Sequence, residues 1–169
     1  MWVFDATPLI YLAKVQRLDT LGALDNRRVV PERVFQEVVT TGLDQGYPDA
    51  RRIERAVESG QFDVRPAEDI ALLSRLQTNT SLSDADAAVL ALAFQHDGVA
   101  VMDEGYGRDV AASEGVTTRG TAYLVVKLAS DGVITATAAR ETIDAMIEEG
   151  WYCAPDVYAR IVQVLESLP

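Results

Sequence analysis

Aspartates follow the two most apolar short segments of the chain. The segment Trp2–Phe4 runs directly into Asp5, and the segment Val99–Met102 runs into Asp103. If both segments are neighbouring strands of a parallel sheet, their carboxyl ends meet at one edge and bring the two acids close together. Two adjacent carboxylates repel each other unless one is protonated or a cation lies between them. Mg²⁺ and Mn²⁺ prefer oxygen ligands, so the pattern predicts a divalent-metal site.

For three further acids, a structural role explains the sequence pattern as well as a functional role does. Ser83-Asp84-Ala85-Asp86 has the spacing of a capping box, in which Asp86 would hydrogen-bond the start of a helix. Asp84 is then a first-turn acid that the helix dipole favours. The start of that helix would also face the edge of the sheet, so Asp86 can serve both roles. Glu37 lies off the apolar stripe of its own segment, a pattern typical of a side chain that faces solvent.

The scarcity of histidine and cysteine limits the chemistry. Among 169 residues, Cys153 is the only cysteine and His96 the only histidine. A disulfide framework, a cysteine-based metal site and any centre that needs two imidazoles are therefore excluded. We expect His96 to be solvated at a helix end and Cys153 to be a small buried residue. Catalysis, if present, would depend on carboxylates.

The charge balance is strongly acidic. Asp and Glu number 26 against 15 basic residues, only two of them lysine, for a net charge of −11. Many carboxylates with almost no lysine are typical of proteins adapted to molar salt, where ions screen repulsion within about 3 Å. We therefore predict a halophilic protein. The balance argues against a simple basic groove for nucleic acid, so cations would mediate contact with a polyanion.

Apolar runs alternate with helical patterns along the whole chain, which favours a parallel sheet covered on both faces. We expect a three-layer α/β/α sandwich with a central, mainly parallel sheet, formed as one domain over 1–169. Its core would span about 1–120 and a C-terminal helical extension about 121–169. The expected strands are 2–4, 28–30, 62–65 (at an edge), 99–102 and 116–118. The expected helices are 8–15 (with Thr7 as N-cap), 31–40, 48–59, 68–77, 83–95, 108–114, 121–130, 135–149 and 155–168.

The acids and their neighbours resemble the PIN-domain nucleases, a family that includes the VapC toxins. The segment Val3–Ile10 is similar to the start of these proteins, where an apolar strand ends in Asp followed by x-Ser/Thr. The family's later acids match three segments in order: Val34-Phe35-Gln36-Glu37-Val38, Leu82-Ser83-Asp84-Ala85-Asp86-Ala87, and Val101-Met102-Asp103-Glu104. The four matches together, over about the first 120 residues, are far more specific than any one of them.

The resemblance extends to nearly the whole chain. Segments downstream are similar to a subgroup of unassigned prokaryotic PIN proteins, which is not reliably paired with a known antitoxin. These segments are Gly107-Arg108-Asp109-Val110-Ala111, Gly120-Thr121, Asp131-Gly132-Val133-Ile134 and Gly150-Trp151-Tyr152-Cys153-Ala154-Pro155-Asp156-Val157-Tyr158.

The resemblance implies a PIN-like fold and a metal-dependent endoribonuclease. One or two Mg²⁺ or Mn²⁺ ions would be held by four acids, and water would attack RNA to leave a 5′-phosphate and a 3′-hydroxyl. Asp84 is the alternative third acid, and Glu104 would share or supplement the role of Asp103. Thr7 would orient Asp5 or a metal-bound water, and Arg108 would contact the substrate. The implied catalytic and metal-binding acids are Asp5, Glu37, Asp86 and Asp103.

Two other functions stay open. Phe4-Asp5-Ala6-Thr7 is similar to the nucleophile strand of haloacid-dehalogenase-type phosphohydrolases. That family needs a second acid where Thr7 stands, and neither lysine is well placed for its chemistry. The third alternative is a non-catalytic nucleic-acid-binding or regulatory module that keeps the PIN fold.

The remaining expectations concern partners and surface residues. We expect a cytoplasmic protein without a membrane span, with RNA as substrate, a homodimeric state, and an antitoxin protein as a further partner if the chain is a toxin. The arginines Arg51, Arg52 and Arg55 could position phosphates, but a solvated helix face is the favoured interpretation. We expect core or dimer contacts from Trp151, Tyr152 and Tyr158.

Overall fold

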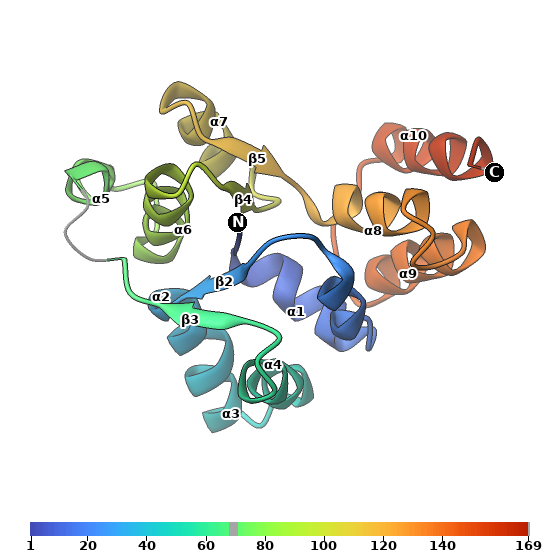
Figure 1. Ribbon diagram of the computed structural model, residues 1–169, viewed down its shortest axis with the longest axis horizontal. Coiled ribbons are helices and arrows are strands. Elements are labelled where there is room, and N and C mark those ends of the chain that lie inside the picture. The colour runs from blue at the N-terminus through green and yellow to red at the C-terminus, as the bar shows by residue number, and fades with distance from the viewer. Residues whose placement is uncertain (68–70, 169) are drawn as a thin grey trace.

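Five parallel strands form the central sheet of the protein. The computed structural model describes residues 1–67 and 71–168. The strand order is β3-β2-β1-β4-β5, so β1 lies in the middle (Figure 1). The strands are β1 (Trp2–Phe4), β2 (Arg28–Pro31), β3 (Asp63–Arg65), β4 (Val99–Val101) and β5 (Thr117–Arg119).

Helices cover both faces of this sheet, as expected for a three-layer α/β/α sandwich. The helix α6 packs against β1, β2 and β4, whereas α1 lies on the other side of the sheet with α4 (Figure 1). The first six helical segments are α1 (Ala6–Lys14), η1 (Leu18–Ala23), α2 (Glu32–Phe35), η2 (Gln36–Thr41), α3 (Gly42–Asp44) and α4 (Pro48–Glu58). The later ones are α5 (Ala71–Leu76), α6 (Asp84–Gln95), α7 (Gly105–Ser113), α8 (Thr121–Ser130), α9 (Ala136–Glu148) and α10 (Pro155–Glu166).

The C-terminal helices form a group of their own beside the sheet. The helices α8, α9 and α10 pack on one another, and α8 and α9 also contact η1 and α1 (Figure 1). The chain between α9 and α10 returns to the end of β4, where Trp151 meets Asp103. The extension therefore reaches the sheet edge at which the two predicted strand-end acids lie.

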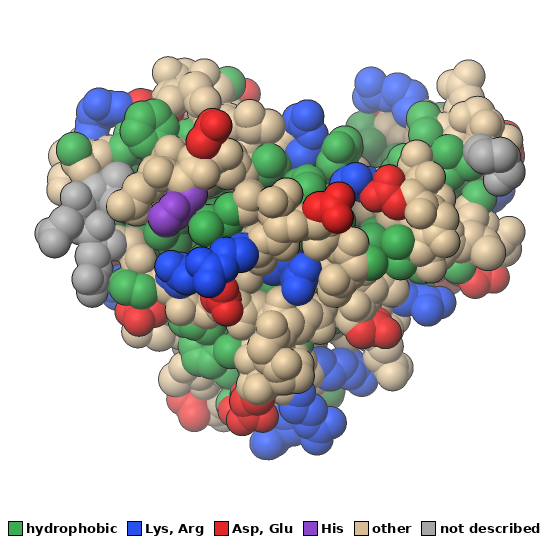
Figure 2. Space-filling model, viewed as in Figure 1, with side chains coloured by type: hydrophobic (Ala, Val, Ile, Leu, Met, Phe, Trp, Pro, Cys, Tyr) green, Lys and Arg blue, Asp and Glu red, His purple; other side chains and the backbone are tan. Residues whose placement is uncertain are grey.

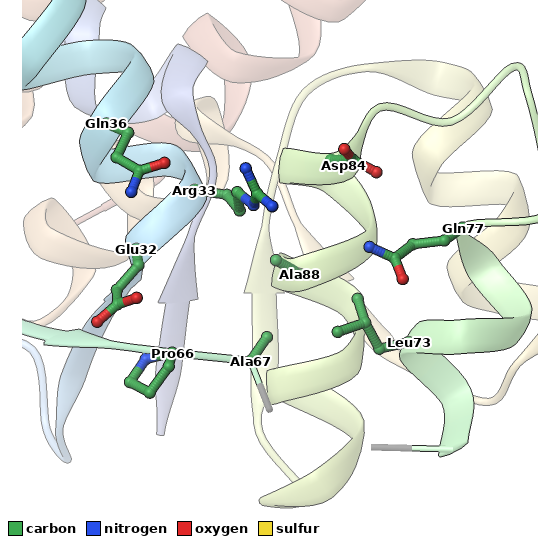
Figure 3. A pocket seen from close by; sticks show the side chains of 9 residues that line it. All are labelled: Glu32, Arg33, Gln36, Pro66, Ala67, Leu73, Gln77, Asp84 and Ala88. Carbon is green, nitrogen blue, oxygen red and sulfur yellow. The ribbon is translucent and has the colours of Figure 1, made fainter. Parts of the chain in front are cut away.

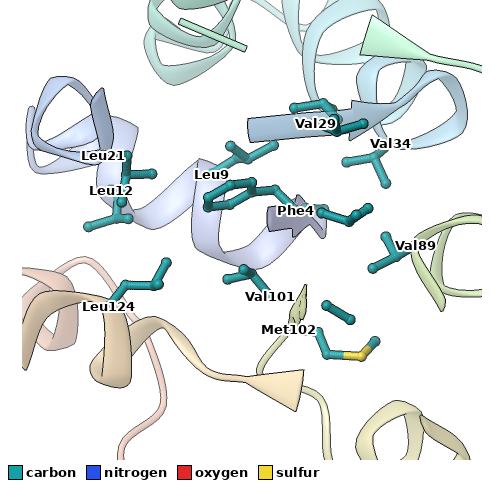
Figure 4. Close-up of a cluster of buried hydrophobic side chains, with 14 of the residues drawn as sticks. Phe4, Leu9, Leu12, Leu21, Val29, Val34, Val89, Val101, Met102 and Leu124 are labelled. Carbon is teal, nitrogen blue, oxygen red and sulfur yellow. The ribbon is translucent and has the colours of Figure 1, made fainter. Parts of the chain in front are cut away.

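The core lies between the sheet and its two helical layers. Val3, Phe4, Val29 and Val101 are fully buried, as expected for strands covered on both faces (Figure 4). The rings of Phe4 and Phe62 pack edge to face, with 5.3 Å between their centroids. This packing fixes β1, whose last residue immediately precedes Asp5.

The first helix begins earlier than the sequence pattern predicts. We expected Thr7 as the N-cap and Pro8 as the first helical residue, but α1 starts at Ala6 with Asp5 in the N-cap position. Pro8 is thus the third residue of the helix. Its missing N–H costs no hydrogen bond there, because N–H groups in the first turn have no partner within the helix. The earlier start places Asp5 directly between strand and helix.

Smaller differences occur at other boundaries. Pro31 ends β2 instead of opening the next helix, which then passes through the π-helical segment η2 and continues into α3. Helix α7 starts at Gly105, three residues before the expected start, while β4 ends at Val101 and β5 runs from Thr117 to Arg119. Of the helix expected over 68–77, residues 68–70 lie outside the described residues. Within the described part, no helix has the length and apolar character of a membrane span.

Candidate active site

Asp5 and Asp103 lie at the carboxyl ends of two adjacent strands. The strands β1 and β4 are paired in parallel, with Phe4 opposite Val101. The backbone N–H of Asp5 continues this ladder by donating to the carbonyl oxygen of Val101 at 2.9 Å. Asp103 follows two residues after Val101. The sequence prediction that these strands are neighbours is therefore confirmed, and their acids share one edge of the sheet.

The Asp5 carboxyl group is buried at this edge. Only 6% of the residue is exposed. Burial is the main reason that the pKa of Asp5 rises from 3.8 to about 7, and the negative charge of Asp86 is the second. The charges of Glu37 and Asp103 raise the pKa further, while the backbone N–H of Ala6 partly offsets these effects. The other three predicted acids are thus close enough to influence the buried Asp5 carboxyl.

Three hydrogen bonds hold the Asp103 carboxylate in place. The backbone N–H of Thr121 donates to Oδ1 at 2.7 Å, and the Thr121 hydroxyl donates to Oδ2 at 2.7 Å. The indole N–H of Trp151 also donates to Oδ2, at 2.9 Å. Gly120 leaves space for this arrangement, because a Cβ atom there would lie 2.9 Å from Oδ1. Two segments of the fold, the start of α8 and the segment between α9 and α10, therefore fix the orientation of one acid.

Asp86 has the capping role that the sequence predicts. Its Oδ2 accepts from the backbone N–H of Ser83 at 3.3 Å and from the Ser83 hydroxyl at 2.6 Å. The Ser83 hydroxyl in turn accepts from the Asp86 N–H at 3.0 Å, which completes a capping box at the start of α6. Both hydrogen bonds to the carboxylate fall on one oxygen. The cap therefore orients Asp86 while its other oxygen remains a candidate ligand.

Asp84 lies on a different part of the same helix end. It is exposed and lines a polar pocket of about 310 Å³ with Arg33, Gln36 and Gln77 (Figure 3). The Arg33 side chain extends from α2 toward α6 in this pocket. The charge of Asp86 raises the pKa of Asp5, while Asp84 lines the pocket beside Arg33. The choice between Asp86 and Asp84 as the third acid stays a prediction.

Glu37 is carried by the π-helical segment η2. It is exposed, as its place outside the apolar stripe predicts, yet its charge still raises the pKa of Asp5. Val38 and Val39 of the same segment are buried and anchor it to the core. Single π turns within α-helices are often found at functional sites. No local sequence signal predicted this π turn.

The family comparison agrees with this geometry. A family model described as a PIN domain matches residues 1–167. The chain belongs to the PIN-domain family. No curated protein and no solved structure matched the chain. PIN domains are generally nucleases that use divalent metal ions, so a nuclease-type function with a nucleic-acid substrate follows for this chain.

The remaining predicted residues of this PIN domain surround Asp103. Glu104 caps α7, because its carboxylate accepts from the backbone N–H groups of Tyr106 at 3.0 Å and Gly107 at 2.5 Å. Thr7 and Glu104 line a pocket of about 410 Å³ that also reaches Asp103. Arg108 is exposed and lines a second pocket with Asp103. A metal-binding role for Glu104 stays a prediction beside this capping role.

The donor set suits a hard divalent cation. Asp5, Glu37, Asp86 and Asp103 offer only carboxylate oxygens, which Mg²⁺ and Mn²⁺ prefer. Within residues 1–67 and 71–168, no three side chains of the His, Cys, Asp or Glu type are already gathered at metal-binding distances.

Thr121 and Trp151 are the residues of this PIN domain that sequence reasoning missed. Trp151 was expected as a core or dimer contact, and it is indeed only 6% exposed. Its hydrogen bond to Asp103 joins positions 48 residues apart, which no local pattern indicates. The motif Gly120-Thr121 directly after β5 was the only available signal for Thr121. Tyr152 is 84% exposed, so it is not a core contact, and its role as a dimer contact stays a prediction.

Proposed function

We propose that this PIN domain is a metal-dependent endoribonuclease whose acids are Asp5, Glu37, Asp86 and Asp103. The pairing of β1 with β4 carries the proposal, since it brings the Asp5 and Asp103 strand ends to one edge. The influence of the other three acids on the buried Asp5 carboxyl supports it. Family membership supplies the nuclease class, and the choice of RNA follows from the resemblance of the acid motifs to VapC-type nucleases.

Mg²⁺ or Mn²⁺ bound by these four acids would polarise the phosphodiester and lower the pKa of a bound water. The chain's own contribution is to position the ligands. Thr121 and Trp151 fix the Asp103 carboxylate, and Ser83 fixes that of Asp86. Asp5 must lose its proton to act as a ligand, so a bound cation and the Asp5 proton compete.

Arg108 and Thr7 lie where they can orient a substrate. A Cβ atom added at Gly120 would lie 2.9 Å from Oδ1 of Asp103 and 3.8 Å from Nη1 of Arg108, so the Arg108 guanidinium is near the Asp103 carboxylate. An exposed guanidinium at this place can bind a phosphate oxygen of the strand. Thr7 stands in the first turn of α1, two residues after Asp5, and lines the pocket next to Asp103. With water as the nucleophile, cleavage would leave a 5′-phosphate and a 3′-hydroxyl.

Cleavage of end-labelled RNA in Mn²⁺ tests the proposal. The wild-type protein should cut and leave 5′-phosphate ends, whereas Asp5→Asn and Asp103→Asn should each reduce the rate at least about 100-fold. Asp44→Asn is the matched control, because Asp44 is exposed on α3. We expect this variant to cut at the wild-type rate. A wild-type protein that does not cut RNA in Mn²⁺ or Mg²⁺ contradicts the proposal.

The same assay separates the two alternatives. Phosphomonoesterase activity without RNA cleavage would indicate the phosphohydrolase, which membership of the PIN family already disfavours. RNA binding without either activity would indicate a non-catalytic module. The toxin role, the antitoxin and the homodimer stay predictions. For a toxin, induced expression of the wild-type chain should arrest growth, and expression of Asp5→Asn should not.

A further inference from the structure

We propose that the pocket between α7, α8 and the segment Trp151–Val157 binds one base of a single-stranded nucleic acid, next to the acids. The pocket has a volume of about 280 Å³. This inference rests on the proposed nuclease function and adds a binding site to it. The residues that carry the argument are Asp103, Arg108, Tyr123, Trp151, Tyr152 and Val157.

The pocket combines an apolar interior with charge at one end. Tyr123, Trp151 and Val157 give it aromatic and aliphatic walls, while Asp103 and Arg108 line it beside the acids. A nucleotide has the same division, with a flat base at one end and a phosphate at the other. Figure 2 shows the surface hollowed between the lobe of α7 and the lobe of α10, and residues of both helices, Arg108 and Val157, line this pocket.

Tyr152 presents an exposed aromatic ring on a fixed backbone. The residue is 84% exposed, although it directly follows the buried Trp151. The Tyr11 hydroxyl donates to the carbonyl oxygen of Gly150 at 3.2 Å, and the backbone N–H of Trp151 donates to the carbonyl oxygen of Met146 at 2.9 Å. Holding a large aromatic ring in water gains nothing for folding. An exposed ring on a backbone segment that is held at the two preceding residues is well suited to stacking on a base, because little backbone order is lost on binding.

Tyr123 is a second tyrosine among the residues that line the pocket. It is 43% exposed, and the guanidinium of Arg119 lies over its ring at 4.9 Å from the centroid. Aromatic rings that stack on bases, with arginines beside them, are the usual elements of single-strand recognition. The two tyrosines, with Arg108 near Asp103, would therefore guide a strand toward the acids.

The ligand is single-stranded because its base must leave the helical stack to enter the pocket. Bases in a duplex are already stacked and cannot reach Tyr152. Stacking also tolerates any base, so this site would supply affinity and register more than sequence specificity. Asp103 lines the pocket and is also one of the four proposed metal ligands, so a nucleotide bound in the pocket would lie beside the scissile phosphate.

Tryptophan fluorescence can report binding at this pocket. Trp2 and Trp151 are the only tryptophans, so a Trp2→Phe protein emits from Trp151 alone. Asp5→Asn is added to prevent cleavage and removes a negative charge that would repel RNA. We expect single-stranded octauridine in Mg²⁺ to quench the Trp151 emission with a saturable curve. Tyr152→Ala should raise the Kd about 10-fold, whereas Tyr152→Phe, which keeps the ring, should change it less than about twofold.

Phe94→Ala is the control for loss of an exposed aromatic ring. Phe94 is 52% exposed near the C-terminal end of α6, far along the helix from Asp86. It should leave the Kd unchanged. Equal Kd values for Tyr152→Ala and Phe94→Ala, or equal quenching by duplex RNA, would overturn the inference. RNA cleavage by the wild type without any quenching also overturns it and leaves the nuclease proposal intact. Quenching with the expected variant pattern but without cleavage supports the base site and contradicts the nuclease.

Discussion

The indole N–H of Trp151 donates a hydrogen bond of 2.9 Å to Oδ2 of Asp103, 48 residues earlier in the chain. Asp103 lies two residues after the end of strand β4, and Trp151 belongs to the C-terminal extension. The extension therefore completes the candidate site as well as covering the core. Hydrogen bonds that orient a metal-binding carboxylate commonly change metal affinity or activity when they are removed.

Trp151→Phe tests this positioning role. The change removes the hydrogen bond and keeps an aromatic ring, so we expect RNA cleavage to fall about 10-fold or more. The Mn²⁺ concentration at half-maximal rate should rise as well, which a purely structural role would not cause. Trp2→Phe is the control, because it loses a comparable bond, from its indole N–H to the carbonyl oxygen of Asp25 at 2.8 Å. Equal effects of both changes on the Mn²⁺ dependence would refute the role.

Gly120→Ala tests the close approach of the backbone to Asp103. An added Cβ would lie 2.9 Å from Oδ1 of Asp103, so the carboxylate must shift. We expect a loss of activity of about 10-fold with a small change in Tm. At Gly105, beside the same site, an added Cβ has no atom within 4 Å. Gly105→Ala should therefore cut RNA normally, and a similar loss in both variants would argue against the steric explanation.

Asp5 should make the stability of the metal-free protein dependent on pH. Its pKa rises from 3.8 to about 7 in the folded protein. Between these values the folded state holds more protons than the unfolded state, so the free energy of unfolding falls as the pH rises. This decrease in the free energy of unfolding is complete above about pH 7 and amounts to at most about 4 kcal/mol.

Thermal melts of wild type and Asp5→Asn in EDTA check this expectation. Asn carries no charge, so the variant should melt several degrees higher than wild type at pH 8, and the gap should narrow toward pH 4. Mn²⁺ should stabilise the wild type more at pH 8 than at pH 5, because protonation of Asp5 competes with the cation. An Asp5→Asn protein that is less stable at pH 8 would contradict the raised pKa.

Salt should stabilise the whole molecule. The net charge is −11, and most of the ion pairs in residues 1–67 and 71–168 involve exposed side chains. Self-repulsion of the excess carboxylates weakens as ions screen them. We expect the Tm at neutral pH to rise strongly between 0.1 M and molar KCl, on the order of 10 °C. A Tm that does not depend on salt would refute the halophilic interpretation.

The parts of the fold that depend on local patterns could be predicted from sequence. The apolar strands before Asp5 and Asp103 indicated a parallel sheet with both acids at one edge, because parallel strands end together. The spacing of Ser83 and Asp86 predicted the capping box, which is confirmed. The start of α1 was wrong by two residues, since Asp5 itself occupies the N-cap position that Thr7 was expected to fill.

Tertiary relationships were beyond the reach of these patterns. The bond between Trp151 and Asp103 depends on how the extension folds back, and the exposure of Tyr152 depends on the turn at Gly150. The π turn that carries Glu37 likewise has no signature in the apolar periodicity. The strand ends and the helix cap that carry Asp5, Asp86 and Asp103 could therefore be predicted from sequence, whereas the residues that orient these acids required the three-dimensional structure.

Direct titration with Mn²⁺ tests whether the acids form one divalent-cation site. Mn²⁺ bound to the protein can be counted by electron paramagnetic resonance, comparing wild type with Asp5→Asn, Asp86→Asn and the exposed control Asp44→Asn. We predict saturable binding of one or two ions by wild type and Asp44→Asn, and affinity at least about 10-fold weaker for Asp5→Asn and Asp86→Asn. Equal Mn²⁺ affinity for all four proteins, or no saturable binding by wild type, would contradict the account.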